Sequence, residues 1–190
     1  MRYWVTSDQH YGHGNIIKYA VRPFSSTEEM NETMIRKFNE RVKPEDITFI
    51  IGDFCFKHPV SQDVDAGGRP VKSSQWLERL NGQKIMIRGN HDNNNSTKTC
   101  IDCIHITYAG KRINMVHKPE HANYDFPINL VGHVHDKWKF QEYVVNGIEH
   151  VSKDEVGVML NIGVDQNKFY PISLDEALGQ IVKYKKGILK

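Results

Sequence analysis

The feature that most constrains this chain is a set of five polar motifs, each following a stretch of residues that predicts a β-strand. The motifs are Asp8-Gln9-His10, Gly52-Asp53, Gly89-Asn90-His91-Asp92, His117 and Gly132-His133-Val134-His135. Side chains at strand ends project into the crevice beyond the carboxyl edge of a sheet. We therefore expect a sheet-based fold whose strands end together around clustered histidine, aspartate and asparagine side chains.

The rest of the sequence predicts an α/β chain. We expect strands over residues 3–7, 47–51, 84–88, 113–116, 129–131 and 158–162, with one more before the turn at 109–111. We expect helices from residue 16, from Ser26, from Ser73 and from Ser173 to near Gly187. Ser26 with Glu29, and Ser173 with Glu176, have the spacing of a capping box. After Ser26 in the sequence, apolar residues recur every four positions, at Met30, Met34, Phe38 and Val42.

The last third of the chain has the pattern of antiparallel strands. Residues 138–145 and 148–152 flank Asn146-Gly147, which is a strong hairpin signal. The order is therefore βα units first and antiparallel strands later. Residues 57–72 carry proline, glycine and charges, and they predict a surface loop.

Length and composition indicate one domain over residues 1–190 with no membrane span. The chain is 39% hydrophobic, and no apolar run approaches the length that crosses a bilayer. The first strand begins at residue 3, so a cleavable signal would remove part of the site, and we expect none. The net charge of +2 is too balanced for a long nucleic-acid footprint.

Cysteine usage favours a reducing compartment, and we expect a cytoplasmic protein. The chain has three cysteines, an odd number, at Cys55, Cys100 and Cys103. Cys100 and Cys103 form a single C-x-x-C pair without a second pair to complete a zinc site. We interpret them as ordinary thiols near a hairpin, with a redox or zinc role as the alternative.

The donor types in the motifs indicate metal chemistry. Carboxylate, amide and imidazole ligands suit borderline divalent ions, with manganese expected first and iron, zinc or nickel as alternatives. Asp8 and His10 are two positions apart, so on an extended strand they would point the same way and bind one ion together. A glycine before Asp53, Asn90 and His133 would let the backbone turn sharply and approach the ions.

The order of the motifs resembles the calcineurin-like metallophosphoesterases, whose pattern runs D-x-H, G-D, G-N-H-D/E, H, G-H-x-H. The match extends from Asp8 to His135. The stretches 8–17, 22–24, 161–165 and 171–175 also look like a small prokaryotic and viral subgroup of that family. The resemblance implies a four-layer α-β-β-α sandwich of two mixed sheets flanked by helices.

The resemblance also implies the ligands of two divalent metal ions. Asp8, His10 and His135 would hold one ion, and Asn90, His117 and His133 would hold the second. Asp53 would bridge the two. Such a pair, about 3.5–4 Å apart, activates water and clamps a phosphoryl group during in-line displacement.

Four further residues receive roles as hypotheses. The family uses the histidine corresponding to His91 to steady developing charge and to protonate the leaving oxygen. Asp92 would orient His91 or a neighbouring cation, with a turn carboxylate as the alternative. His13 and Arg22 would contact substrate phosphate, with a capping histidine and a surface arginine as the alternatives. The other histidines, at 58, 105, 121 and 150, carry no motif, and we expect them at the surface.

The sequence thus predicts a metal-dependent phosphoric ester hydrolase in which a metal-bridging hydroxide attacks a small phosphodiester or nucleotide. The oligomeric state is left open by the sequence. A phosphomonoesterase of the same fold is one alternative, and a non-catalytic binding scaffold is another. A nuclease acting on nucleic-acid ends is a third. A protein phosphatase is disfavoured, because Gly52-Asp53-Phe54-Cys55-Phe56 lacks the G-D-x-x-D-R-G extension.

Overall fold

The computed structural model describes residues 1–56, 71–92, 99–147 and 156–189. The strands in these ranges are β1 (Tyr3–Thr6), β2 (Ile47–Ile51), β3 (Gln83–Ile87), β4 (Cys103–Tyr108), β5 (Lys111–Val116), β6 (Ile128–Val131), β7 (Phe140–Val144), β8 (Val156–Asn161) and β9 (Ile172–Ser173). The α-helices are α1 (Asn15–Tyr19), α2 (Thr27–Arg41), α3 (Ser73–Glu78) and α4 (Leu174–Lys185), with 3-10 turns η2 (Pro119–His121) and η3 (Val164–Asn167). The predicted α/β class, with two mixed sheets flanked by helices, is confirmed.

The first sheet has the order β3-β2-β1-β9. Its first three strands are parallel, and β9 pairs antiparallel with β1. The apolar strand β2 lies between two neighbours and is almost entirely buried, as its sequence predicted. Because β1, β2 and β3 run in the same direction, their carboxyl ends meet at one edge of this sheet.

The second sheet has the order β4-β5-β6-β8-β7. Its outer pairs, β4 with β5 and β7 with β8, are antiparallel. Its central pairs, β5 with β6 and β6 with β8, are parallel, so this sheet is mixed, as the family resemblance implied. The described parts of the segments that join these parallel strands contain no α-helix, which is why the sequence pattern did not indicate parallel pairing. The carboxyl ends of β5 and β6 therefore also share an edge.

The antiparallel partner of β7 is β8, with Val144 opposite Val156. The predicted partner strand at 148–152 lies outside the described residues, as does most of the predicted loop at 57–72. Asn146 and Gly147 do form a turn after β7, and Gly147 has a φ of 82°.

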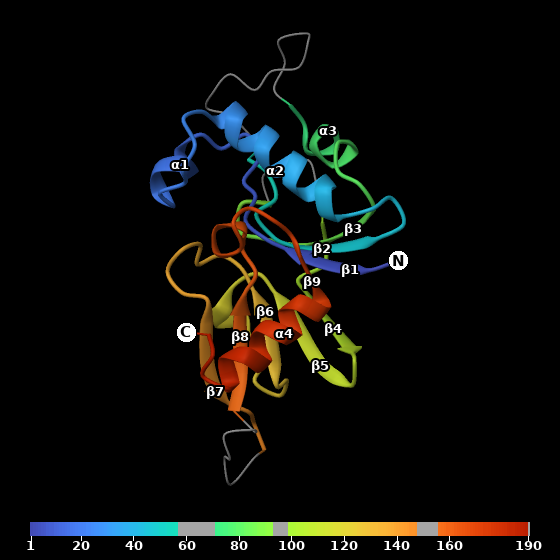
Figure 1. The fold of residues 1–190 in the computed structure, drawn as a ribbon, viewed down its shortest axis with the longest axis vertical. Coiled ribbons are helices and arrows are strands. Elements are labelled where there is room, and N and C mark those ends of the chain that lie inside the picture. Colours follow the sequence, from blue (N-terminus) through green and yellow to red (C-terminus); the bar gives the residue numbers. More distant parts are fainter. Residues whose placement is uncertain (57–70, 93–98, 148–155, 190) are drawn as a thin grey trace.

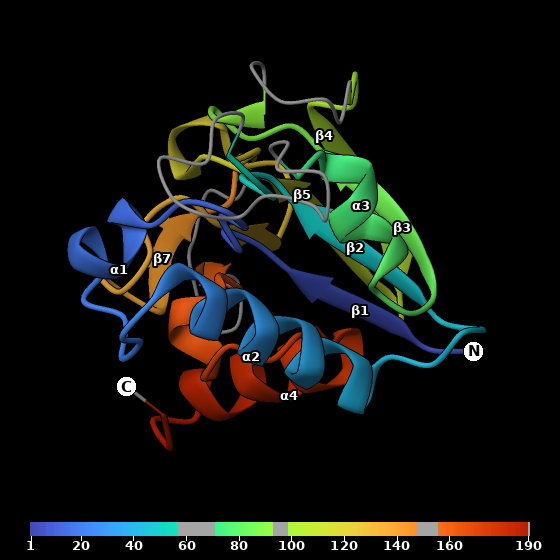
Figure 2. The ribbon, with the colours of Figure 1, turned by 90° about the horizontal axis from the view of Figure 1, so that it is seen from above.

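Both faces of the first sheet are buried. Trp4 belongs to a cluster that joins the sheet to α1, α2 and α3, whereas its neighbour Val5 belongs to the cluster between the sheets. Figure 1 shows α1, α2 and α3 above the first sheet and α4 in front of the second. Figure 2 shows α2 alongside β1 and α3 over β2 and β3. The buried side chains of α4, including Leu174 and Ile181, join the cluster between the sheets.

The two predicted capping boxes differ. Ser173 accepts from the backbone of Glu176, and the Glu176 carboxylate accepts from the Ser173 backbone, so this box is complete. Ser26 accepts from the Glu29 backbone, but the Glu29 carboxylate accepts from Ser25 instead. No helix in the described ranges has both the length and the apolar character needed to cross a membrane.

Candidate metal centre

The polar motifs lie on loops that leave the strands at the two facing sheet edges, and these loops are hydrogen-bonded to one another. The Asp8 backbone N–H donates to the Gly52 carbonyl over 3.1 Å. The His133 N–H donates to both Asp8 carboxylate oxygens, at 3.1 and 3.0 Å. The Gly132 N–H donates to the His117 carbonyl over 2.9 Å. These bonds join segments of both sheets into one site.

Five of the predicted ligands have left-handed backbone conformations, which non-glycine residues rarely adopt. Their φ values are 61° at Asp8, 53° at His10, 51° at Asp53, 71° at His133 and 48° at His135. Each such residue costs about 1–3 kcal/mol and persists only where its surroundings enforce it. Asp8 and His10 therefore converge through these turns beyond the end of β1, so the prediction that they point the same way from an extended strand was wrong.

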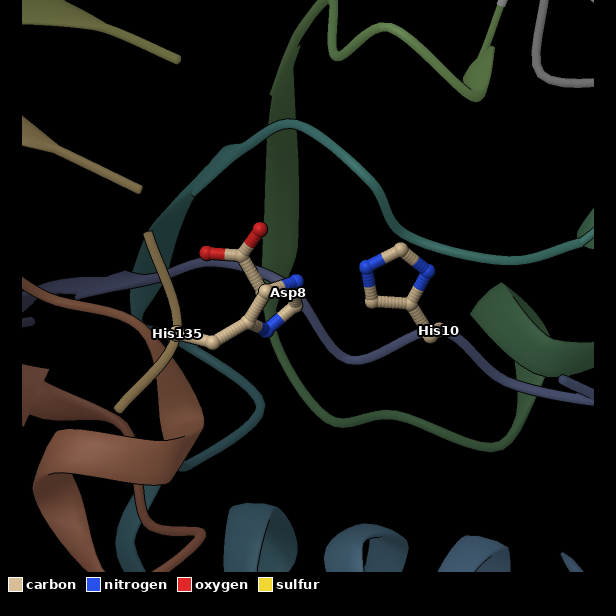
Figure 3. Close-up of side chains that lie close together, drawn as sticks. All are labelled: Asp8, His10 and His135. Carbon is tan, nitrogen blue, oxygen red and sulfur yellow. The ribbon is translucent and has the colours of Figure 1, made fainter. Parts of the chain in front are cut away.

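The first ligand group comprises Asp8, His10 and His135, whose ligand atoms all lie within 4.8 Å of one another. Figure 3 shows the three side chains converging from two separate loops. Both ring nitrogens of the buried His10 lack a hydrogen-bond partner in the structure. Burial also lowers the pKa of His10 well below its usual range, so the ring is neutral. A neutral buried imidazole with unpartnered nitrogens has the donor chemistry that a divalent metal requires.

The second group comprises Asp53, His117 and His133, again with ligand atoms within 4.8 Å of one another. The predicted fourth ligand, Asn90, is close by, because its Oδ1 lies 3.1 Å from Nε2 of His117. Carboxylate, amide and imidazole donors thus meet here as the sequence predicted. The residues present fit a second divalent ion.

Asp53, a member of the second group, also lies close to the first. Its Oδ2 is 3.6 Å from Nε2 of His10 and 3.3 Å from Nε2 of His117. Burial opposes its ionisation, but the hydrogen bond and charge of His117, with the charge of His10, hold its pKa well below the usual range. A permanently ionised carboxylate in this place is suited to neutralising two cations together.

Two of the histidines are held so that Nε2 faces the cluster. Nδ1 of His117 lies 2.9 Å from the Ile51 carbonyl, and Nδ1 of His135 lies 2.9 Å from Oδ2 of Asp165. Such bonds fix the ring orientation and the tautomer of metal-binding histidines. Asp165 was not among the residues predicted for the site. Its only signal was the stretch 161–165, noted for its resemblance to the subgroup.

His91 lies at the mouth of the site and belongs to neither ligand group. Its backbone N–H donates to Oδ1 of Asp53 over 2.9 Å. Its side chain is 40% exposed, with Nε2 4.0 Å from Oδ2 of Asp53. This placement is compatible with the predicted proton donor, which needs access to substrate as well as to the metals.

His13 also lies beside the cluster. Its ring stacks on Phe56 at 4.2 Å between centroids and is 5.4 Å from the ring of His10. Burial, followed by the charges of His91 and Arg22, lowers its pKa to about 4, so the ring is neutral near pH 7. Its role toward substrate stays a prediction.

Arg22 is placed differently from the prediction. Its side chain is fully buried, and its N–H groups bond to Asp165, to the carbonyls of Asp8 and Gln9, and to the Met30 sulfur. With these bonds all five guanidinium donors are engaged. Arg22 therefore supports the ligand loop, and the expectation that it contacts substrate phosphate was wrong.

Asp92 is likewise a structural residue here. Its carboxylate accepts from the backbone N–H groups of Gly89, Asp53 and Phe54, at 2.7, 2.9 and 3.2 Å. It thereby ties the loop after β2 to the loop after β3. This geometry agrees with the turn-carboxylate alternative.

Among the described residues, no cysteine belongs to either ligand group, and neither does His105 or His121. Cys100 and Cys103 are exposed and carry free thiols, and Cys55 is buried. His105 and His121 are exposed, as expected. His58 and His150 lie outside the described residues.

Comparison with known proteins agrees with this geometry. The family model for calcineurin-like phosphoesterase matches residues 1–154. An uncharacterized protein of Methanocaldococcus jannaschii, MJ1445, is 30% identical over 189 residues, which cover 96% of this chain and 92% of the relative. The crystal structure of AQ665 from Aquifex aeolicus, a protein of unknown function, has the same fold. It aligns with a TM-score of 0.64 at 22% identity, covering 94% of this chain and 98% of that one. The chain therefore belongs to the calcineurin-like phosphoesterase family.

Proposed function

We propose that this protein hydrolyses a small phosphodiester or nucleotide at a pair of divalent metal ions, with manganese as the metal in the cell. The single observation that carries the proposal is the position of Asp53. One ionised carboxylate lies within 3.6 Å of a histidine from each ligand group. A shared carboxylate between two three-residue groups is the arrangement that a metal pair needs.

The residues of the site would have two kinds of role, as metal ligands and as a proton donor. Asp8, His10 and His135 would hold one ion, Asn90, His117 and His133 the other, and Asp53 both. When bound, the ions supply activated water and neutralise phosphoryl oxygens for an in-line displacement. His91, which is half-exposed beside Asp53, would donate a proton to the leaving oxygen.

A proton donor matters most for a poor leaving group, such as the alkoxide of a phosphodiester. The surroundings of His91 also favour a planar leaving group. Phe56 stacks on His13, and the ring of Tyr19, which is 73% exposed, meets His13 edge-on at 6.3 Å. Tyr19 and Phe56, which both contact the buried ring of His13, offer aromatic side chains beside the metal groups, and a nucleobase can stack on such side chains.

The proposal places the protein in the cytoplasm, since free thiols are compatible with a reducing compartment. The balanced charge of the chain supports a small substrate over long nucleic acid. The oligomeric state has no part in the proposal.

The test is a comparison of an aryl phosphodiester with the matching aryl monoester, using purified protein with manganese and other divalent ions. We expect faster hydrolysis of the diester, stimulation by manganese and loss of activity with a chelator. Asp53→Asn serves as the inactive control. A clear preference for the monoester would favour the phosphomonoesterase alternative. Binding of two ions without hydrolysis of any ester would favour the non-catalytic scaffold.

The aromatic side chains have their own test. Tyr19→Ala should raise KM for a nucleotide substrate about fivefold or more, because base–aromatic stacking contributes ~1–3 kcal/mol. Val21→Ala, at a neighbouring and equally exposed apolar position, is the matched control and should leave KM unchanged. Equal KM values in both variants would remove the nucleobase from the proposal but leave phosphoester hydrolysis in place.

A further inference from the structure

A buried ion pair lies behind the first ligand group. The carboxylate of Asp165, in η3, receives Nε of Arg22 at 2.8 Å on Oδ1 and Nη2 of Arg22 at 3.1 Å on Oδ2. Oδ2 also lies 2.9 Å from Nδ1 of His135. Both side chains of the ion pair are almost fully buried. A buried charge pair of this kind is costly unless its geometry is fixed by further hydrogen bonds.

Those further bonds go to the other ligands of the same group. Nη2 of Arg22 donates to the Asp8 carbonyl at 2.6 Å, and Nη1 donates to the Gln9 carbonyl at 3.0 Å. Gln9 lies between the two ligands Asp8 and His10, both of which have left-handed backbone. Arg22 therefore hydrogen-bonds the strained backbone segment that carries the ligands Asp8 and His10, while Asp165 hydrogen-bonds the third ligand, His135.

We infer that Asp165 and Arg22 act together as positioning residues for the Asp8, His10 and His135 group. Asp165 keeps the proton of His135 on Nδ1, so that Nε2 presents its lone pair to the ion. Arg22 compensates the buried carboxylate and ties it to the backbone at Asp8 and Gln9. The inference concerns metal binding, so it does not depend on which ester the protein cleaves.

The inference predicts selectivity between the two groups. His117 of the second group is oriented by the Ile51 carbonyl, with no contribution from Asp165 or Arg22. A change at the ion pair should therefore weaken the first ion and spare the second. A merely structural pair would affect both ions through general loss of stability.

Asp165→Asn is the informative substitution because it keeps the size of the side chain. An amide has one acceptor oxygen, whereas both Asp165 oxygens accept in the structure. The –NH2 group must then face an N–H of Arg22 or Nδ1 of His135. In the second case the –NH2 group favours the His135 tautomer with the proton on Nε2, and a protonated Nε2 cannot bind a metal.

The experiment measures manganese binding by calorimetry in two backgrounds, each retaining one ligand group. His133→Ala removes a ligand of the second group, and His10→Ala removes a ligand of the first. We expect Asp165→Asn to weaken manganese binding about 10–100-fold in the His133→Ala background. In the His10→Ala background we expect a change within about twofold, as for independent sites.

Two controls make the result decisive. Melting of each metal-free variant, followed by circular dichroism, reports whether it is folded. Arg41→Lys alters another arginine that bonds a carboxylate, of Glu176, and a carbonyl, of Pro171, and it should leave manganese affinity unchanged. If Asp165→Asn does not melt cooperatively, Arg22→Lys replaces it, since lysine keeps the charge but loses the planar fork.

The expected result is loss of affinity in the His133→Ala background only. Equal loss in both backgrounds would overturn the inference and make the pair a general stabilising element. Unchanged affinity in both backgrounds would overturn it as well. Neither result would bear on phosphoester hydrolysis, which the substrate comparison tests separately.

Discussion

At the scale of single residues, the site is defined by side chains that the fold holds in unfavourable states. Asp8 is buried, and burial raises its pKa. His10 is buried with neither ring nitrogen bonded, and both residues have left-handed backbone. Divalent ions would relieve the electrostatic part of this cost, because they satisfy the carboxylate and the imidazole together.

The shared carboxylate gives the first prediction. Asp53→Asn should reduce bound metal below two equivalents and lower kcat/KM by more than about 100-fold. Substitution of a residue that only hydrogen-bonds a metal ligand already lowers metal affinity or activity about 10–100-fold, and loss of a shared ligand should have a larger effect. The reason is that one side chain serves both ligand groups. Elemental analysis together with ester hydrolysis measures both effects. Retention of two equivalents with wild-type turnover would contradict the assignment of Asp53 as the bridge.

The second prediction separates a ligand from a proton donor. His91→Ala should keep two metal equivalents and lower kcat by ~10²–10⁴-fold, the usual contribution of general acid catalysis. His91 lies in neither ligand group, and its backbone, which the substitution preserves, makes the bond to Asp53. If the variant loses metal instead, His91 is a ligand and not a proton donor.

At the scale of elements, glycines let the loops approach each other. Gly52 has a φ of 80°, and an added Cβ there would lie 2.5 Å from Nδ1 of His117. Gly89 and Gly132 are needed for space alone, because their φ values are not positive. A Cβ on Gly132 would lie 2.0 Å from Oγ of Ser7 and 2.6 Å from Oδ2 of Asp8. The predicted sharp turn therefore applies to Gly52, and the close approach applies to all three.

The third prediction uses two glycines of the same chain. Gly132→Ala should destabilise the protein by ~1–3 kcal/mol and weaken metal binding, since the loop after β6 must move away from Asp8. Gly179→Ala is the matched control. It lies inside α4 with nothing within 4 Å of the added Cβ, and it should stabilise the protein by ~0.5–1 kcal/mol. Thermal denaturation of both variants gives the comparison, and equal melting temperatures would show that the loops tolerate a Cβ.

At the scale of the whole molecule, the site depends on two sheet edges that face each other. Loops after β1, β2 and β3 contribute one set of ligands, and loops after β5 and β6 contribute the other. Each ligand group combines residues from both sheets, as Figure 3 shows for Asp8 and His10 with His135. Bound ions would therefore link the two sheets.

The fourth prediction follows from this linkage. Manganese at a concentration of about 100 times its dissociation constant should stabilise the fold by ~2.7 kcal/mol per ion. For a chain of this length that raises the melting temperature by ~5–10 °C per ion. Scanning calorimetry with chelator and with manganese measures the rise, and Asp53→Asn should show a smaller one. Equal melting temperatures with and without metal would mean that neither group binds manganese in the folded state.

Local sequence patterns were enough to predict most helices and strands and the types of ligand. Apolar strands such as Ile47–Ile51, the four-residue apolar repeat of α2 and the Ser173 cap are local patterns, and local patterns decide whether a segment becomes a strand or a helix. The order of the polar motifs indicated which residues would gather only through its resemblance to a known family. The strands, the helix and the cap could be predicted from the linear chain because they depend on near neighbours.

The roles of the supporting residues depend on contacts that form only in the folded protein. Arg22 and Asp165 are 143 positions apart, and no local pattern shows that the five donors of Arg22 bond to a buried carboxylate, two carbonyls and the Met30 sulfur. The parallel pairing of β5 with β6 and the left-handed turns at Asp8 and His10 were hidden for the same reason. Each depends on contacts between distant segments, which exist only once the two sheets have packed together.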